Sequence, residues 1–196
     1  YTETAKLTAE RRYKRVEKDN ACPQVESNVV IVSVYPALTS GTISNDQTIC
    51  YNTQPATLTC SAPSGGNETY TYQWQKSIDA TNYDNMAGET NPSCTPSLLT
   101  TSTFFRRVVS TPGCGSATSP SVKVNVQNQL LPGTVGSDHS ICYGGTSTTI
   151  SNVINATGGS QSYTLRWSKS IDGGASWEDM AEYTGTLNPM VLYQTT

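Results

Sequence analysis

Apolar and polar side chains alternate in short runs along most of this chain. Tyr70, Tyr72 and Trp74 occupy every second position of one run, which is the pattern of a half-buried strand. Clusters of Gly, Pro, Asn, Ser and Thr separate the runs and favour turns. No stretch shows the apolar period of an amphipathic helix, so the sequence predicts an all-β protein.

Residues 39–128 hold a complete set of predicted strands. About seven short strands with turn signals every 8–12 residues are typical of an immunoglobulin-like β-sandwich, which is the fold we expect. A turn at 111–115 is expected to join the last two strands as a hairpin. The strands are expected at residues 42–49, 56–62, 70–76, 83–87, 95–100, 103–110 and 121–126.

The chain repeats itself with a period of 92 residues. Residues 41–51 recur as 133–143, so that Cys142 stands 92 positions after Cys50. Residues 73–79 recur as 166–172, displaced by one extra residue. Three further blocks keep the register of 92: residues 13–16 with 105–108, Cys22 with Cys114, and residues 32–34 with 124–126. The sequence therefore predicts tandem immunoglobulin-like β-sandwich repeats.

The register divides the chain into three parts. Residues 1–36 correspond to the C-terminal part of one repeat, 39–128 to a complete repeat, and 131–196 to the N-terminal part of a third. We expect a segment of a longer repetitive protein, in which neighbouring repeats of the same protein are partners and short linkers make a semi-rigid rod. In an alternative, the third part of one chain completes the first part of another, which would build a fibre or a ring by strand exchange.

Three motifs resemble a known family. They are TICYN at residues 48–52 followed by LTCSAP at 58–63, TYQWQKSID at 71–79 and TTSTFFRRVVSTPGCGSATSPSVKVNV at 100–126. Together they resemble the immunoglobulin-like repeats of giant surface proteins of Bacteroidetes, such as gliding-motility adhesins and other type IX secreted proteins. The resemblance covers nearly the whole chain and implies export, cell-surface placement and adhesion, but no ligand. Cys60 and Cys94 depart from the neighbouring repeats of this chain, which lack them.

Six cysteines in a chain of this texture indicate an oxidising compartment, so disulfides are expected first. Cys60 and Cys94 occur together in one repeat and on strands expected to be neighbours, which indicates one disulfide. Two pairings stay open for the other four cysteines. The favoured one is Cys50–Cys114 within the repeat, with the partners of Cys22 and Cys142 uncertain; the other is Cys22–Cys50 and Cys114–Cys142, between adjacent repeats.

Composition excludes several classes of function. Charged residues make up 14% of the chain and the formal net charge is −3, which disfavours binding to nucleic acid. No apolar run approaches the roughly 18 residues that span a bilayer, so no membrane insertion is expected in this segment. A single histidine leaves zinc or haem with too few ligands, and no acidic run suits calcium. We expect no metal site and no cofactor.

Residues 170–177 fit the S-x-D-x-G-x-x-W pattern of the Asp box, a hairpin-turn motif familiar from sialidases. In that motif the Asp binds turn backbone and the Trp packs beneath it, so we interpret Asp172 and its counterpart Asp79 as structural. An exposed ring at Tyr83 or Trp177 could stack on a sugar, and these two residues are the candidates for glycan binding.

No set of residues has the pattern of a catalytic site. His139 is the only histidine, so a Ser-His-Asp system has no support. Two carboxylate pairs, Asp84 with Glu89 and Glu178 with Asp179, are interpreted as solvated turn residues rather than an acid–base pair. We expect no catalytic residue and therefore no enzyme.

Arg106 and Arg107 are adjacent in a predicted strand, and Lys14 and Arg15 hold the same positions one period earlier. Because side chains alternate along a strand, the two members of each pair lie on opposite faces. One member of each pair therefore needs a partner on the inner face, and we expect a structural ion pair rather than a ligand site.

The leading hypothesis is a non-catalytic structural or adhesive segment of a large extracellular or cell-surface protein. Many weak sites for an extracellular surface ligand or glycan would act together through avidity. Alternatives are a carbohydrate-binding module, or an accessory domain of a secreted hydrolase whose catalytic sequence lies elsewhere.

Overall fold

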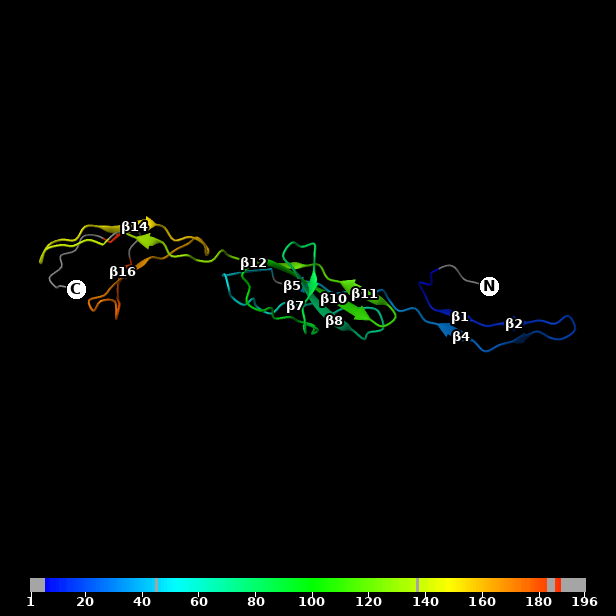
Figure 1. Ribbon diagram of the computed structural model, residues 1–196. Coiled ribbons are helices and arrows are strands. Elements are labelled where there is room, and N and C mark those ends of the chain that lie inside the picture. Colours follow the sequence, from blue (N-terminus) through cyan, green and yellow to red (C-terminus); the bar gives the residue numbers. More distant parts are fainter. Residues whose placement is uncertain (1–5, 45, 137, 183–185, 188–196) are drawn as a thin grey trace. The chain divides into compact units, whose positions relative to one another are not determined.

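The structure is a computed structural model that describes residues 6–44, 46–136, 138–182 and 186–187. Over these ranges the chain forms strands and turns without a helix, which confirms the prediction of an all-β protein (Figure 1). The strands form several separate sheets, and the chain falls into two compact units. One unit contains the chain up to Asn45 together with Thr57–Cys94 and Phe104–Val122, and the other contains Asp46–Ala56, Thr95–Thr103 and the chain from Lys123 onward.

The central strands of the first unit are β8 (Thr71–Ser77) and β10 (Thr103–Thr111). They pair antiparallel over seven residues, and β9 (Asp84–Asn85) pairs with the other edge of β8. The C-terminal end of β10 turns into β11 (Gly115–Thr118), which pairs back on it. Strict alternation along β10 buries every second side chain, as expected of a strand with one face on a core.

The core of the chain is centred on these strands. Trp74 from β8 and Phe105 and Val109 from β10 are completely buried, together with Leu58. The indole N–H of Trp74 donates to the backbone carbonyl of Asn91 at 2.9 Å, which satisfies the polar end of this side chain. Among the described residues, all those classed as buried fall between Ser40 and Val124.

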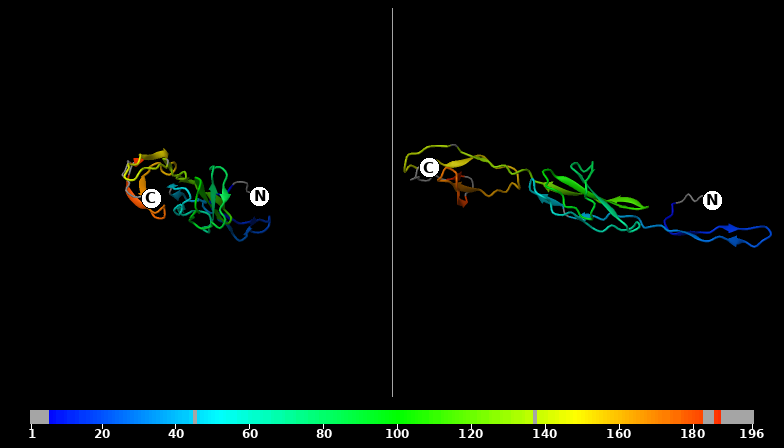
Figure 2. Two further views of the ribbon diagram at one scale, coloured as in Figure 1. Left: turned by 60° about the vertical axis from the view of Figure 1, so that its left-hand side comes forward. Right: turned by 60° about the horizontal axis from the view of Figure 1, so that its bottom comes forward.

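The first unit also contains a long two-stranded ribbon at residues 11–32, visible in Figures 1 and 2. Its strands are β1 (Arg11–Tyr13) with β4 (Val30–Val32), and β2 (Val16–Glu17) with β3 (Val25–Glu26), all antiparallel. A further antiparallel pair joins β5 (Ile43–Ser44) to β7 (Thr59–Cys60).

Seven of the described strands lie wholly or mostly in the second unit. Strand β6 (Gln47–Ile49) pairs in parallel with β12 (Val122–Val126). Strand β14 (Ile150–Ile154) lies between β13 (Thr134–Val135) and β17 (Thr186–Leu187), and β15 (Arg166–Lys169) pairs with β16 (Glu178–Glu182).

Some predicted strands differ from the observed ones for local reasons. The strand predicted at 42–49 is split into β5 and β6, because its first half pairs with β7 and its second half with β12. The strand predicted at 95–100 is reduced to isolated bridges at Cys94 and Leu99; Pro96, which has no N–H to donate, lies between them.

The hairpin turn predicted at 111–115 exists, with the Cys114 N–H donating to the Thr111 carbonyl at 3.3 Å. The second strand of the hairpin is interrupted: β11 pairs with β10 directly after the turn, and the strand at 122–126 is a further neighbour of β10 in the same sheet. Ser119, Pro120 and Ser121 separate β11 from β12, and Pro120 has no N–H to donate to a ladder. The predicted division into residues 1–36, 39–128 and 131–196 rests on the sequence repeat and stays a prediction.

Candidate functional site

The guanidinium of Arg107 occupies a cage of backbone carbonyl oxygens. Its side chain points from β10 to the inner face and is 1% exposed. One terminal nitrogen donates to the carbonyl of Pro92 at 2.8 Å, and the other donates to those of Ser40 at 2.7 Å and Ser61 at 3.0 Å. The guanidinium carbon lies 4.9 Å from the centre of the Tyr72 ring. The cage thus joins three separate segments of the chain to β10.

The Arg107 cage corrects one prediction. Among the described residues no carboxylate pairs with Arg107, so the expected ion pair is wrong, and the positive charge is held by carbonyl dipoles and an aromatic face instead. The Nε atom is buried without a hydrogen-bond partner. Charges buried in this way are costly, so the carbonyl contacts are needed to keep the side chain inside.

Arg106 points to the opposite face of β10, as the alternation predicts. Its guanidinium lies 3.7 Å from the centre of the Tyr83 ring, and its Nε donates to Gln75 Oε1 at 2.7 Å. Because the arginine covers one face of this ring, only the other face of Tyr83 can meet a sugar. This contact makes Tyr83 a weaker glycan candidate than the sequence alone suggested.

Trp177 lies in the turn between β15 and β16 and is 67% exposed. Its indole N–H donates to the carbonyl of Gly174 at 3.2 Å, which holds the ring beside the turn and leaves much of its surface in solvent. Ile171 in the same turn is similarly exposed. The turn therefore presents an aromatic and an aliphatic side chain to solvent.

Asp172 organises this turn through hydrogen bonds. Its carboxylate accepts from the Ser176 N–H at 2.9 Å and from the hydroxyls of Ser170 at 2.7 Å and Ser176 at 2.5 Å. These donors stabilise the ionised form, so the pKa of Asp172 is well below its ordinary value. The geometry agrees with the structural interpretation of Asp172, whereas Trp177, which the motif places beneath the turn, is largely exposed.

Asp79 holds the equivalent turn in the same way. Its carboxylate accepts from the backbone N–H groups of Thr81 and Asn82 at 2.8 Å each, and from the Ser77 hydroxyl at 2.8 Å. Hydrogen bonds from Asn82 are the first cause of a strongly lowered pKa at Asp79. Both aspartates are thus committed to their own turns.

All six cysteines are free thiols in the structure. Cys94 is buried and exchanges two backbone hydrogen bonds with Leu58, at 2.7 and 3.1 Å. Cys60 follows Leu58 by two positions, so its side chain lies on the same face of that segment as the side chain of Leu58. Burial raises the pKa of Cys94 to about 12, and the negative charge of Glu89 adds to the rise. Burial also raises the pKa of Cys60, although the charge of Arg107 opposes the shift. The disulfide pairings stay predictions. The exposed cysteines are Cys22, Cys50, Cys114 and Cys142.

The remaining candidate residues are not brought together into a site. His139 Nε2 lies 3.3 Å from the Thr148 hydroxyl, in an exposed loop. Glu178 pairs with Lys169 at 3.2 Å and Asp179 with Arg166 at 2.7 Å, both at the surface. Within the described ranges no group of three or more His, Cys, Asp and Glu side chains is arranged to hold a metal ion. The described residues also contain no helix that is long and apolar enough to cross a membrane.

A cavity of about 160 Å³ opens among β13, β14 and β15. Sequence reasoning did not single it out, because it depends on how three strands are placed. One sequence feature could have pointed to the cavity: Gly133, which lies in its wall, repeats Gly41 one period later. Its wall is formed by Gly133, Val135, Asn152, Ile154, Ala156, Leu165, Arg166 and Trp167.

Over the described ranges, the chain is an all-β protein of several small sheets, with buried side chains between Ser40 and Val124 and large exposed apolar side chains elsewhere. Residues 39–128 and 131–196 match the family described as "Domain of unknown function (DUF8696)", and the chain belongs to this family. No curated protein matches the chain.

Proposed function

We propose that this chain is a non-catalytic structural and adhesive repeat segment of a large cell-surface or secreted protein. The observation that carries the proposal is a linker contact that occurs twice. The Gly66 N–H donates to the Pro36 carbonyl at 2.9 Å, and the Gly159 N–H donates to the Asn128 carbonyl at the same distance. Both contacts tie a linker to a later loop of the chain.

The glycines beside these contacts make the linkers fit closely. A Cβ on Gly65 would lie 2.0 Å from the Ala37 carbonyl oxygen, and one on Gly158 would lie 1.9 Å from that of Gln129. The loop is held in turn by a tyrosine, since the Tyr70 hydroxyl donates to the Gly65 carbonyl and the Tyr163 hydroxyl to that of Gly158. A linker fixed by such contacts is not a free tether, which suits a stalk built from repeated domains.

Placement outside the cell is supported by the sequence. Six cysteines, the texture of Thr, Ser and Asn, and the resemblance to surface adhesins all favour an exported protein, and a type IX secreted protein of gliding motility is the specific form of this proposal. In this function the immunoglobulin-like repeats, with their 92-residue period, extend or multiply a binding surface.

Surface exposure of the native protein tests the proposal. An antibody raised against this chain should label intact cells of the source organism, and external protease should remove the signal without lysis. A signal that appears only after lysis would refute placement at the surface. Inactivity on glycan and peptide substrates is expected of the purified chain.

A carbohydrate-binding module is the second candidate function, favoured by the exposed ring of Trp177. A glycan array tests it with the full chain and two variants of the same turn. Saturable binding that is lost in Trp177→Ala and kept in Ile171→Ala would identify a lectin-like module. Absence of binding by the unmodified chain would leave a stalk, and equal loss in both variants would indicate a disturbed turn rather than a sugar contact.

A further inference from the structure

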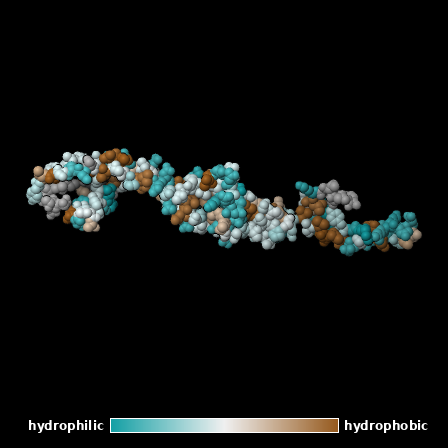
Figure 3. All heavy atoms as spheres, in the orientation of Figure 1, coloured by the Kyte–Doolittle hydropathy of each residue, from teal (hydrophilic) through white to brown (hydrophobic). Residues whose placement is uncertain are grey.

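Four of the six cysteines are exposed and stand at two recurring positions. Cys22 and Cys114 lie in the turns of two hairpins, and Cys50 and Cys142 each precede a tyrosine, one period apart. Figure 3 shows a largely hydrophilic surface over β2 and β3, the strands on either side of Cys22. Because these thiols are not part of a core, their chemistry rather than their packing is what needs an explanation.

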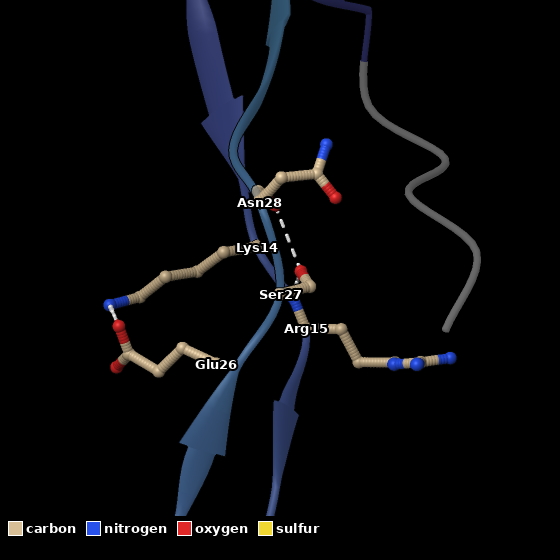
Figure 4. A network of polar contacts seen from close by, with 5 residues as sticks. All are labelled: Lys14, Arg15, Glu26, Ser27 and Asn28. Atoms are coloured by element: carbon tan, nitrogen blue, oxygen red, sulfur yellow. Dashed lines mark hydrogen bonds and ion pairs between the residues drawn. The ribbon is translucent and has the colours of Figure 1, made fainter.

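The two hairpins that carry a cysteine are the same element, one period apart. The Arg15 N–H donates to Ser27 Oγ at 2.8 Å and the Ser27 N–H donates to the Arg15 carbonyl at 2.8 Å (Figure 4). Arg107 and Ser119 make the same two hydrogen bonds, each at 2.9 Å. Each repeat therefore builds this hairpin in the same way and places one cysteine in its turn.

The turn that contains Cys114 is held by a loop of the same repeat. Asn67 Nδ2 donates to the Pro112 carbonyl at 3.3 Å, and the neighbouring Gly66 N–H donates to the Pro36 carbonyl at 2.9 Å. The loop thus contacts both the hairpin turn and the linker that precedes the repeat. The hairpin cysteine is therefore placed at the end of the repeat to which the preceding repeat is attached.

Cys50 lies beside the other linker, the one that leads to the following repeat. Its thiol donates to Gln127 Oε1 at 3.7 Å. It lines a cavity of about 600 Å³ together with this linker and with Gly159 and Ser160 of the following repeat. The Gly159 N–H donates to the Asn128 carbonyl at 2.9 Å, so this loop holds its linker as the loop of the complete repeat does.

The loop that lines this cavity has a known counterpart. Residues 158–163 correspond to residues 65–70, and in both loops the tyrosine hydroxyl at the end donates to the glycine carbonyl at the start. In the complete repeat this loop holds the hairpin turn at 111–115. The corresponding turn of the following repeat is therefore directed to the loop that lines the cavity beside Cys50.

We propose that consecutive repeats are joined by a disulfide between the cysteine at the position of Cys50 and the hairpin cysteine, at the position of Cys114, of the following repeat. The inference rests on the proposed function, in which complete repeats follow one another. The partner of Cys50 then lies one period after Cys114, and the partner of Cys114 one period before Cys50. Each repeat is linked in this register to both of its neighbours, and the bridge crosses the linker at every junction.

Formation of the bridge is an oxidation that needs an acceptor for electrons. The two thiols lose two protons and two electrons as the S–S bond forms, and the disulfide of an oxidoreductase in the exporting compartment takes them up and becomes two thiols. The bridge adds a covalent link to the hydrogen bonds that Gly66 and Gly159 make to their linkers. Such a junction resists bending and extension better than hydrogen bonds alone, which suits a stalk.

A non-reducing peptide map of the native protein from its source organism, with free thiols blocked by alkylation, tests the bridge. Trypsin, chymotrypsin and Glu-C together cut between all six cysteines. The peptide with Cys50 should be linked to a hairpin peptide of the following repeat, and the peptide with Cys114 to a peptide of the preceding one. A link of Cys50 to Cys114 or to Cys22, a link of Cys114 to Cys142, or alkylated Cys50 overturns the inference.

A variant of the native protein provides the matched comparison. Cys50→Ser should release the hairpin thiol of the following repeat, so that its peptide becomes alkylated. Cys60→Ser, which changes a cysteine at another position of the same repeat, should leave that hairpin peptide linked. Equal alkylation of the hairpin peptide in both variants overturns the inference.

Residues 1–196 alone give a second test, in a buffer of reduced and oxidised glutathione. Because neither partner lies within these residues, Cys50 and Cys114 should each be recovered as a mixed disulfide with glutathione. Buried Cys94 is the internal control and should react at least about tenfold more slowly than Cys50. A direct link between Cys50 and Cys114 under these conditions contradicts the proposed register.

These results are distinguishable from failure of the proposed function. A protein that external protease reaches on intact cells, but whose Cys50 is alkylated, keeps the proposed surface placement and loses the bridge. A protein that carries the expected bridge but is labelled only after lysis supports the register of the disulfide and refutes placement at the cell surface.

Discussion

Substitution of Arg107 by Ala removes the side chain that joins β10 to three carbonyl oxygens. The Ser40 carbonyl lies in a buried contact, while those of Ser61 and Pro92 are only partly buried. A buried acceptor left without a donor costs about 1–3 kcal/mol, and the two partly buried acceptors recover some hydrogen bonding from water. The truncation also leaves a cavity beside Tyr72. We expect a loss of about 3 kcal/mol in the free energy of unfolding.

Urea unfolding followed by tryptophan fluorescence measures this loss. Phe in place of Trp167 and Trp177 leaves Trp74, which is fully buried in the same core, as the only reporter. The midpoint should fall while the slope with urea stays unchanged, because the surface exposed on unfolding is nearly the same. Arg107→Met, which keeps most of the side-chain volume, should lower the free energy of unfolding less than Arg107→Ala does. The difference between the two losses measures the contribution of packing, apart from that of the hydrogen bonds.

Arg106→Ala is the matched control for this experiment. Arg106 makes a partly buried hydrogen bond to Gln75 and a ring contact with Tyr83, so its loss should cost about 1 kcal/mol or less. Equal losses for Arg106→Ala and Arg107→Ala, within about 0.5 kcal/mol, would show that the carbonyl cage is not a main support of the core.

Three further predictions concern the linker, a buried thiol and a turn. Gly65→Ala should lower the Tm of thermal unfolding more than Gly88→Ala does. Both glycines have φ of +78°, but only a Cβ on Gly65 would meet a carbonyl oxygen, at 2.0 Å. Equal shifts in Tm would refute the clash. Alkylation of the native protein followed by mass spectrometry should modify exposed Cys114 well before Cys94, whose pKa is raised to about 12, and equal rates would contradict its burial. The carboxyl of Asp172 should titrate by NMR below the ordinary Asp value near 3.9. Because its folded pKa is lowered, the stability that this carboxylate contributes is present above the ordinary value and is lost as pH falls through the folded pKa. A midpoint at or above 3.9 would refute the hydrogen-bonded turn.

Several features of the fold could be predicted from local patterns. Alternation of apolar residues located β8 and β10 within one residue at each end, because a period of two is a direct consequence of strand geometry. The same alternation placed Arg106 and Arg107 on opposite faces. The pattern S-x-D-x-G-x-x-W predicted that Asp172 binds its own turn, since donors and acceptor lie within four residues.

Pairing partners and buried polar contacts depend on residues that are far apart in the sequence. The sequence did not show that residues 42–49 divide between two partners, or that the acceptors of Arg107 come from positions 40, 61 and 92. An ion pair was expected because a buried charge needs compensation, but the chain provides it through carbonyl dipoles that no side-chain pattern records.

By itself, the amino-acid sequence determined the all-β class, the strand positions with strong alternation, the internal recurrence and the structural role of the Asp-box turns. These features arise from contacts between near neighbours, so they are written in short patterns. Only the tertiary structure decided which apolar faces are covered. It buried the face of Phe105, Val122 and Val124 and left that of Tyr13, Val30 and Val32 exposed, although the two sets of residues have the same pattern. Burial is a property of what packs against a strand, and that is set by segments far away in the chain.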